Sequence, residues 1–490
     1  MKTKRIIAVV LAAGWVTAFA QAPAQEAPET LKGVIQKKLA PVSKEVLRVK
    51  LPRVVDRKLK CGLPVMGIES HRSPSVDLDL VLPATSLMDP AGLAGVAGAT
   101  ASLMREGTQK YSSQQIAEKL AQMGATLSLG GGGGGPRGGG RRGGGGGGAR
   151  VTRLVASAPT ENLDELLELV GQVLLHPSFP QDELDRWKAQ QRSQLVQMRA
   201  TPAFLGLERL RQALYGGDAR AIDEPTLESL EKIRRQDLTD FYKAYYRPGN
   251  SLLGVAGDIS ADAIVAKLEK EIGGWAPGRA ERPDLPLKGP LAERKIYLVD
   301  RPNSVQTQLI LANRAMGRTD PDYIACMVMN RVLGQGPSAR LFRNIREEKG
   351  FTYGVSSAFT ATRFSNHFMA SSSVRTEVTG PAIDAFLDEF RAIREKPVGG
   401  EELDNVKRAI VAGFALSLES VNGVLSQRMQ AREYGLAEDY WDTYPEKVMA
   451  VTAAEVQRVA RKYVPLKNVQ LIAVGDGSKI AEVLSKYGPP

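Results

Sequence analysis

The sequence predicts an α+β fold made of two homologous domains, each with an antiparallel-rich sheet packed by helices, joined by a linker into a clamshell. Two observations support this prediction. Strand-like and helical segments come in adjacent pairs, which disfavours the strict alternation of a doubly wound parallel sheet. The pattern of the first half also returns after about 215 residues, a period that indicates duplication and is far too long for a solenoid repeat.

The N-terminus, residues 1–20, is typical of a secretory signal peptide. A basic stretch at residues 2–5 precedes the apolar run 6–13, and residues 18–20 (Ala-Phe-Ala) offer small side chains for cleavage. No later stretch reaches the roughly 18 uninterrupted apolar residues that a transmembrane helix needs. We therefore expect an exported protein without a transmembrane segment, located in a bacterial periplasm, with residues 21–45 as a flexible lead-in.

The composition is modestly basic and poor in cysteine. Lys and Arg number 65 against 54 Asp and Glu, a net charge of +11, or +8 once the three positive charges of the signal peptide are subtracted. This balance would attract acidic peptides but is weak evidence for nucleic acid, which we do not expect as a partner. Cys61 and Cys326 alone cannot form a disulfide scaffold. The apolar helical stretch 323–332 favours a buried thiol at Cys326 over a disulfide with Cys61.

Secondary-structure signals follow in order through the first half. Residues 75–82 alternate as a strand, Ser112 and Gln115 make the pattern of a capping box at the start of a helix, and residues 151–157 return as a strand. Between two strand-like runs lies the Gly/Arg-rich segment 130–148, which we interpret as a flexible insertion in a hairpin turn. An Arg/Gly tract that binds RNA is the alternative, and export disfavours it.

The two halves repeat one another in detail. Equivalent positions occur at nearly equal spacing, as Tyr215, Pro248, Asn250 and Asp258 in the first half and Tyr434, Pro465, Asn468 and Asp476 in the second. Between them the composition shifts toward Pro, Arg, Lys and Gly, which is typical of an interdomain linker. The predicted organisation is an N-terminal domain at residues 46–276, a linker at 277–293 and a C-terminal domain at 294–487.

A series of short motifs in the first half resembles a known type of peptidase domain. The motifs are Leu59-Lys-Cys-Gly-Leu-Pro-Val65, Asp89-Pro-Ala-Gly-Leu-Ala94, Gly107-Thr108 and Gly124-Ala125. Their order is similar to the opening of the insulinase-like (pitrilysin or mitochondrial processing peptidase-like) zinc metallopeptidases. In that family a helix in this segment carries His-x-x-Glu-His, whose two His bind zinc while the Glu activates water.

The positions that match this motif carry no metal ligands. Counting forward from the Gly-Leu-Ala that ends at Ala94 gives Gly95, Gly98 and Ala99, whereas counting back from Gly107-Thr108 gives Gly98, Ala101 and Ser102. The family's third ligand would fall at about Ser193-Gln194. The resemblance therefore implies a non-catalytic member that lacks the motif and holds no metal or other cofactor.

The second half resembles the family's other characteristic segment. Residues 333–342 read Leu-Gly-Gln-Gly-Pro-Ser-Ala-Arg-Leu-Phe, and Arg346 and Tyr353 match the pair that holds the substrate backbone near the scissile bond. An Arg offers forked donors to a carbonyl, and a phenol can donate to a developing oxyanion. The resemblance implies substrate binding by Arg346 and Tyr353, assisted by Gly334, Gly336 and Ser338.

A simpler interpretation of the pair stays open at this point. Arg346 could cap a helix end or pair with Glu347 or Glu348, and Tyr353 could be an ordinary strand aromatic. For the whole chain, we expect the non-catalytic subunit of a periplasmic heterodimeric zinc peptidase. Its partners would be a homologous zinc-bearing peptidase subunit and a peptide substrate, with zinc in the partner. The alternative is a stand-alone peptide-binding or assembly pseudoenzyme of the cell envelope.

Overall fold

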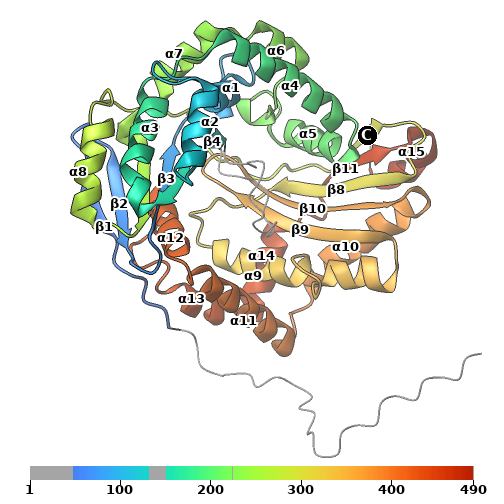
Figure 1. The fold of residues 1–490 in the computed structure, drawn as a ribbon. Helices are drawn as coiled ribbons and strands as arrows, with labels where there is room; N and C mark the ends of the chain where they lie inside the picture. The colour runs from blue at the N-terminus through green and yellow to red at the C-terminus, as the bar shows by residue number, and fades with distance from the viewer. Residues whose placement is uncertain (1–47, 132–150, 223, 489–490) are drawn as a thin grey trace, which may run out of the picture. The chain divides into compact units, whose positions relative to one another are not determined.

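The computed structural model describes residues 48–131, 151–222 and 224–488, which belong to one compact unit, Val46–Pro490 (Figure 1). The predicted signal peptide and lead-in lie outside the described residues, as do residues 132–148 of the predicted insertion.

The first half forms a mixed sheet. Within the described residues it has six strands in the spatial order β1-β2-β6-β3-β5-β4. Their bounds are Val55–Lys58 (β1), Pro64–Glu69 (β2), Ser75–Leu82 (β3), Thr126–Gly131 (β4), Thr152–Pro159 (β5) and Leu252–Gly257 (β6). Neighbours are antiparallel except β2 and β6, which pair in parallel. β4 pairs with β5 on either side of the predicted insertion, so its flanking strands form the expected hairpin pair.

Helices of the first half pack against this sheet around one apolar core. Their bounds are Val96–Leu103 (α1), Ser113–Gln122 (α2), Leu163–Leu175 (α3), Gln181–Arg199 (α4), Leu227–Lys232 (α6), Arg235–Tyr245 (α7) and Ala261–Ile272 (α8). Alternation on β3 buries Val76, Leu78 and Leu80, which are at most 2% exposed. The strand predicted at 75–82 and the capping box of Ser112 and Gln115 are both confirmed.

The second half repeats the plan with a smaller sheet. In the part of the chain that the structure describes, its five strands have the order β7-β11-β8-β10-β9. The strands are Lys295–Asp300 (β7), Gln306–Arg314 (β8), Thr352–Ala361 (β9), Asn366–Arg375 (β10) and Gln470–Gly475 (β11). The helices are Tyr323–Leu333 (α9), the π-helical turn Phe342–Glu348 (η5), Thr379–Glu395 (α10), Gly400–Ser417 (α11), Val421–Tyr434 (α12), Tyr444–Ala450 (α13), Ala453–Tyr463 (α14) and Gly477–Ser485 (α15).

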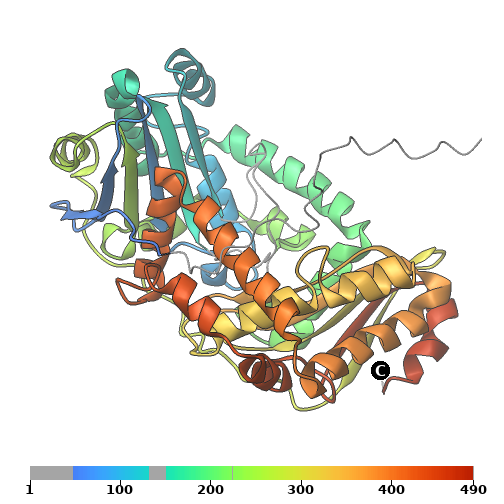
Figure 2. The same ribbon diagram turned by 90° about the horizontal axis from the view of Figure 1, so that it is seen from below.

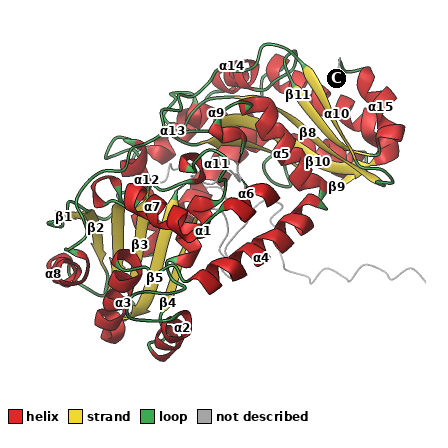
Figure 3. Cartoon of the chain, turned by 90° about the horizontal axis from the view of Figure 1, so that it is seen from above, coloured by secondary structure: helices red, strands yellow, loops and turns green. Residues whose placement is uncertain are grey.

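The two halves exchange helices across the molecule. Helix α5, Pro202–Tyr215, follows α4 in the first half but packs on β8 and β11 of the second sheet (Figure 3). In return, α12 of the second half packs on β2 and β6 of the first sheet, beside the blue and green strands in Figure 2. A sheet with apolar side chains on both faces must bury both of them. Here a helix from the other half covers one face of each sheet.

The repeated Tyr marks the end of each exchanged helix. The Tyr215 hydroxyl at the end of α5 donates to the Asn366 carbonyl and accepts from the Asn366 N–H, both at 3.0 Å. Close by, the Arg220 side chain is 1% exposed, pairs with Asp218 and donates to the carbonyls of Pro286 and Phe364. These bonds fasten the end of α5 to both the linker and the second sheet.

The repeated Asn fixes the segment between the halves. The Asn250 amide donates to the Ala280 carbonyl at 2.9 Å and accepts from its N–H at 3.0 Å. At the equivalent position, Asn468 donates to the Leu291 carbonyl at 2.9 Å. Residues 276–291 contain no helix or strand, and the predicted domain boundaries around them stay predictions.

Two further expectations concern the cysteines and the membrane. Cys61 and Cys326 are both buried and free, which confirms the buried thiol expected at Cys326. Among the described helices, none is by itself long and apolar enough to cross a membrane. Helices α11 and α12 reach the required length and composition only together, as a pair bent by 110°.

Candidate functional site

Helix α1 lies where the resemblance places the zinc-binding helix. The exposure of its residues bears on the choice between the two alignments of His-x-x-Glu-His. Gly98 is exposed and Ser102 is partly exposed, whereas Ala99 and Ala101 are fully buried. Residues 98 and 102, four apart, lie on one side of the helix, and a Cβ at Gly98 would meet no atom within 4 Å. For the two ligand positions the count from Gly107-Thr108 fits better, because the other one would place a ligand at Ala99, inside the core. Its Glu position, Ala101, is buried as well.

The side chains at this place do not fit a zinc ion. Gly98, Ala101 and Ser102 offer no imidazole, thiolate or carboxylate, and the exposed Ser193 and Gln194 on α4 add none. Among the described residues there is no group of three His, Cys, Asp or Glu side chains that could hold a metal ion. No zinc-dependent step can be assigned to these residues.

A partly buried carboxylate caps α1 where it begins. Asp89 accepts hydrogen bonds from the N–H groups of Gly95 and Ala97, each at 2.7 Å. Burial raises the pKa of Asp89 to about 6, although both backbone bonds favour the charged form and lower it.

One turn beyond the motif, Arg105 donates to the carbonyl of Leu127 on the edge strand β4 at 2.9 Å. This bond ties the end of the helix to the edge of the sheet.

The structure brings Arg346 and Tyr353 together. Arg346 lies in η5 and Tyr353 is the second residue of β9; between them Gly350, with φ of 60°, allows the chain to reverse. The Arg346 guanidinium carbon is 5.2 Å from the centroid of the Tyr353 ring and 4.6 Å from that of Phe342. The cation thus rests between two aromatic rings, an arrangement that orients it without neutralising it.

Both side chains are available to a ligand. Tyr353 is 91% exposed and Arg346 is half-buried. Among the described residues, neither the Arg346 guanidinium nor the Tyr353 hydroxyl has a hydrogen-bond or ion-pair partner, so the pairing with Glu347 or Glu348 is absent. An exposed aromatic on an edge strand with nothing packed on it contributes little to the core, which favours a binding role over a structural one.

The start of β9 is held firmly although its side chains are open. The Arg375 side chain on β10 donates to the Gly350 carbonyl at 2.9 Å, and the Thr352 hydroxyl donates to the Ser373 carbonyl at 2.6 Å. These residues line a shallow hollow beside Tyr353. The hydroxyl of Tyr353 and the donors of Arg346 therefore stand on a fixed support, as substrate-positioning groups require.

The other predicted site residues, Gly334, Gly336 and Ser338, lie in different environments. Gly334 is buried where a Cβ would collide with Ser357 of β9, and its carbonyl accepts from the Ser357 N–H at 3.0 Å. Gly336, with φ of 107°, needs glycine for its backbone, and Ser338 is exposed. Gly334 thus serves packing, and the structure does not join Gly336 or Ser338 to the Arg346 and Tyr353 pair.

Sequence reasoning missed two residues that organise the pair. Phe342 supports the Arg346 guanidinium, and its spacing of four residues, which places both on one helical side, could have shown this. Arg375 fixes the turn at Gly350 from a different strand, and no local signal in the sequence links it to that turn.

Together these observations define a duplicated, two-sheet α+β protein of the zinc-peptidase class whose metal-binding helix carries no ligands. Residues 232–410 match the protein family described as Peptidase M16 inactive domain. The chain is thus a homologue of the M16 peptidases, and its matching residues resemble the inactive type of domain, in line with the insulinase-like resemblance of the sequence. The fold class and the family resemblance predicted from the sequence are confirmed.

Relatives named as a peptidase and as a non-peptidase homologue both match much of the chain, and a solved structure shares its fold. The chain is 21% identical over 425 residues to the "Non-peptidase homolog YmxG" of Helicobacter pylori, covering 85% of this chain and 93% of that protein. It is 23% identical over 329 residues to the "Uncharacterized zinc protease YmxG" of Bacillus subtilis, covering 66% and 74%. The fold matches a peptidase M16 inactive domain from Pseudomonas fluorescens with a TM-score of 0.78 at 24% identity, covering 87% of this chain and 98% of that one.

Proposed function

We propose that this chain is the exported, non-catalytic subunit of a periplasmic heterodimeric zinc peptidase. In this complex a homologous partner subunit holds the zinc, and Arg346 and Tyr353 of this chain hold the peptide substrate. The observation that carries the proposal is a contrast within one molecule. Helix α1 carries no metal ligand, whereas Tyr353 is exposed, Arg346 is half-buried, and neither has a polar partner among the described residues.

The two side chains suit an extended peptide. The Arg346 guanidinium can donate to a backbone carbonyl in a forked geometry, and the Tyr353 hydroxyl can donate to the oxygen that gains charge when the carbonyl is attacked. Neither group can activate water or bind zinc, so both chemical tasks fall to the partner. The signal-like N-terminus supports an exported location, and the inactive type of the family supports pairing with an active chain.

The test uses the heterodimer reconstituted with a zinc-bearing M16 chain from the same organism. Arg346→Ala and Tyr353→Phe should each lower the rate of peptide hydrolysis by about 10²- to 10³-fold, because each removes a donor to the transition state. Arg343→Ala is the matched control, since Arg343 is an exposed arginine of the same turn η5. It should leave the rate unchanged.

Measuring assembly shows whether a lower rate of hydrolysis comes from the catalytic step or from a damaged complex. Size-exclusion chromatography and zinc analysis should show an intact complex with the partner's zinc for all three variants. If Arg346→Ala and Tyr353→Phe assemble and cleave at the parent rate, the pair has no role in the substrate complex. The stand-alone peptide-binding protein of the envelope then becomes the better proposal, as it would if no zinc-bearing chain associates with this one.

A further inference from the structure

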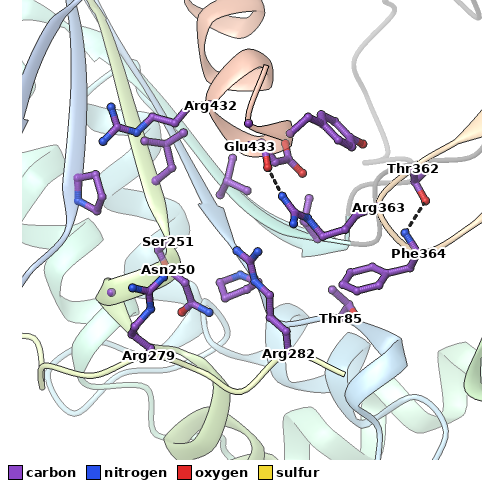
Figure 4. Close-up of a pocket in the computed structure, with 18 of the residues that line it drawn as sticks. Thr85, Asn250, Ser251, Arg279, Arg282, Thr362, Arg363, Phe364, Arg432 and Glu433 are labelled. Atoms are coloured by element: carbon purple, nitrogen blue, oxygen red, sulfur yellow. Dashed lines mark hydrogen bonds between the residues drawn. The ribbon is translucent and has the colours of Figure 1, made fainter. Parts of the chain in front are cut away.

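A second candidate site lies away from Arg346 and Tyr353, in a pocket of about 390 Å³ bounded by both halves and the linker (Figure 4). Four arginines line it: Arg279 and Arg282 from the linker, Arg363 from the turn between β9 and β10, and Arg432 from α12. Most of the remaining wall is apolar, including Val81, Met88, Val151, Leu252 and Phe364. The pocket therefore combines several cationic groups with an apolar floor.

The linker arginines are held in place by the backbone between them. Asn250 binds both the N–H and the carbonyl of Ala280, at 3.0 and 2.9 Å. Gly249 adds a backbone bond to the carbonyl of Gly278 at 2.8 Å. Because these contacts fix the chain next to Arg279, the positions from which the linker side chains enter the pocket are set by the fold.

The third arginine is presented by an equally fixed turn. The Thr362 hydroxyl accepts from the N–H of Phe364 at 3.3 Å and of Ser365 at 2.9 Å, which closes the turn that carries Arg363. The Arg363 guanidinium points into the pocket and donates to the backbone carbonyl of Glu433 at the end of α12 (Figure 4). Arg363 thus enters from the second half, opposite the linker.

Positive charge in the pocket is not balanced. Among the described residues, Arg279 and Arg282 have no hydrogen-bond or ion-pair partner. Arg279, Arg282 and Arg363 are exposed, and the pKa of Arg282 is lowered, first by desolvation and then by the nearby Arg363 and Arg279 cations. Glu433 is the one acidic residue among the described lining residues and attracts Arg282 and Arg363, although burial raises its pKa, so one carboxyl faces several arginines. An anion entering this pocket would relieve the repulsion among the guanidinium groups.

We propose that this pocket binds a carboxylate carried on an apolar residue, as at the C-terminus of a peptide that ends in leucine. Arg282 and Arg363 hold the carboxylate, and the apolar side chain lies against the wall. The fourth arginine of the lining, Arg432, already pairs with Asp56 at 2.8 Å and adds no free charge. Guanidinium groups match a carboxylate in forked pairs, and an inorganic anion would leave the apolar wall unused.

The choice of a peptide as the carrier of this carboxylate rests on the function proposed above, whereas the binding itself needs no partner subunit. The probe is a five-residue peptide that ends in leucine, labelled at its N-terminus, either as the free acid or as the C-terminal amide. Fluorescence anisotropy with the isolated chain should show at least about tenfold tighter binding of the acid, the effect of one charge-assisted pair. Equal affinities for acid and amide would overturn the proposal.

Competition distinguishes the sources of the anion. N-acetyl-leucine should displace the labelled acid, and inorganic phosphate at the same concentration should not, because phosphate lacks an apolar body. If phosphate competes as well as N-acetyl-leucine, the pocket is a general anion site and the assignment of an apolar carboxylate is wrong.

Matched arginine variants locate the site. Arg282→Gln removes a side chain that has no hydrogen-bond or ion-pair partner among the described residues, and should weaken binding of the acid by about tenfold while leaving the amide unchanged. Arg186→Gln on α4 is the control, since it makes the same charge change at an exposed arginine that bonds only to Glu183. Parent-like binding by Arg282→Gln, or an equal loss in Arg186→Gln, would place the carboxylate elsewhere.

Variants also distinguish the arginine-lined pocket from the pair of Arg346 and Tyr353 in the second half. Arg343→Ala should bind the labelled acid like the parent, because Arg343 is exposed and does not line the pocket. If Arg346→Ala abolishes hydrolysis in the heterodimer while Arg282→Gln has no effect on peptide binding, the pocket proposal fails and the proposed function stands. The reverse pattern supports the pocket and removes the role of Arg346.

Discussion

Single residues in this protein show what remains when a metal site is lost. Gly98 and Ser102 still occupy the two positions of α1 that a pair of zinc ligands needs, but they leave that side of the helix without a charged or coordinating group. Asp89, just before the helix, accepts from the N–H groups of Gly95 and Ala97, which would otherwise lack an acceptor. The start of the helix is therefore capped although its exposed side carries no metal ligand.

The Asp89 carboxyl should make stability depend on pH. Its pKa of about 6 in the folded protein lies above the value near 3.9 of an unfolded aspartate. Between about pH 4 and 6 the folded state keeps a proton that the unfolded state has released. The free energy of unfolding that Asp89 contributes therefore falls as pH rises through this window and is constant above it.

Comparison with Asp89→Asn isolates this contribution, since the other groups titrate alike in both proteins. From pH 4.5 to 7.5, urea unfolding should show the parent losing about 2 kcal/mol relative to the variant. A difference in stability that does not change with pH would show that the backbone bonds, and not burial, control the Asp89 carboxyl.

At the scale of elements, the exchanged helices depend on glycines that let backbones approach closely. A Cβ on Gly254 of β6 would collide with Met429 and Leu425 of α12. Likewise, a Cβ on Gly206 of α5 would come within 2.9 Å of Ile310 in the second sheet. Each helix thus lies on the sheet of the other half at a glycine, and side chains of the facing element fill the space that the glycine leaves.

Gly254→Ala should therefore lower the free energy of unfolding by about 1–3 kcal/mol, the usual cost of overpacking a filled core. Gly67→Ala on the adjacent strand β2 is the matched control, because its Cβ would meet nothing closer than 3.8 Å. It should leave stability unchanged or slightly higher, since alanine suits a strand better than glycine. Urea unfolding midpoints give both values, and equal effects of the two substitutions would contradict tight packing of α12 on β6.

For the whole molecule, contacts between the halves do not depend on the covalent linker alone. Two apolar clusters, one around α12 and one around α5, combine side chains from both halves. Polar bonds add to them, including those of Tyr215 with Asn366 and of Arg220 with the Phe364 carbonyl. We infer that the halves fold as partners and not as independent domains.

Cutting the linker tests this inference. A specific protease site inserted after the exposed Asp284 should be cleaved, and the two fragments should still elute together in size-exclusion chromatography because their exchanged helices remain buried. The uncut protein with the same insertion is the control. Fragments that separate, each folded by circular dichroism, would show that neither helix is needed to cover the other half's sheet.

The sequence by itself determined the class of the protein and the local parts of its site. Alternation and capping patterns placed β3 and α2, and the family resemblance implied a pair, Arg346 and Tyr353, that the turn at Gly350 does bring together. Such signals are local, because a strand, a cap or a reversed turn depends on residues within one short segment.

The tertiary structure decided which surfaces meet. Periodicity shows that α5 and α12 each have an apolar side, but not that each one covers the sheet of the other half. It also cannot show that Arg282 and Arg363, which are 81 positions apart, enter one pocket. These features depend on contacts between segments that are distant in the sequence. The energies of such contacts come from packing and from charges that the fold brings together, so no single stretch of sequence reveals them.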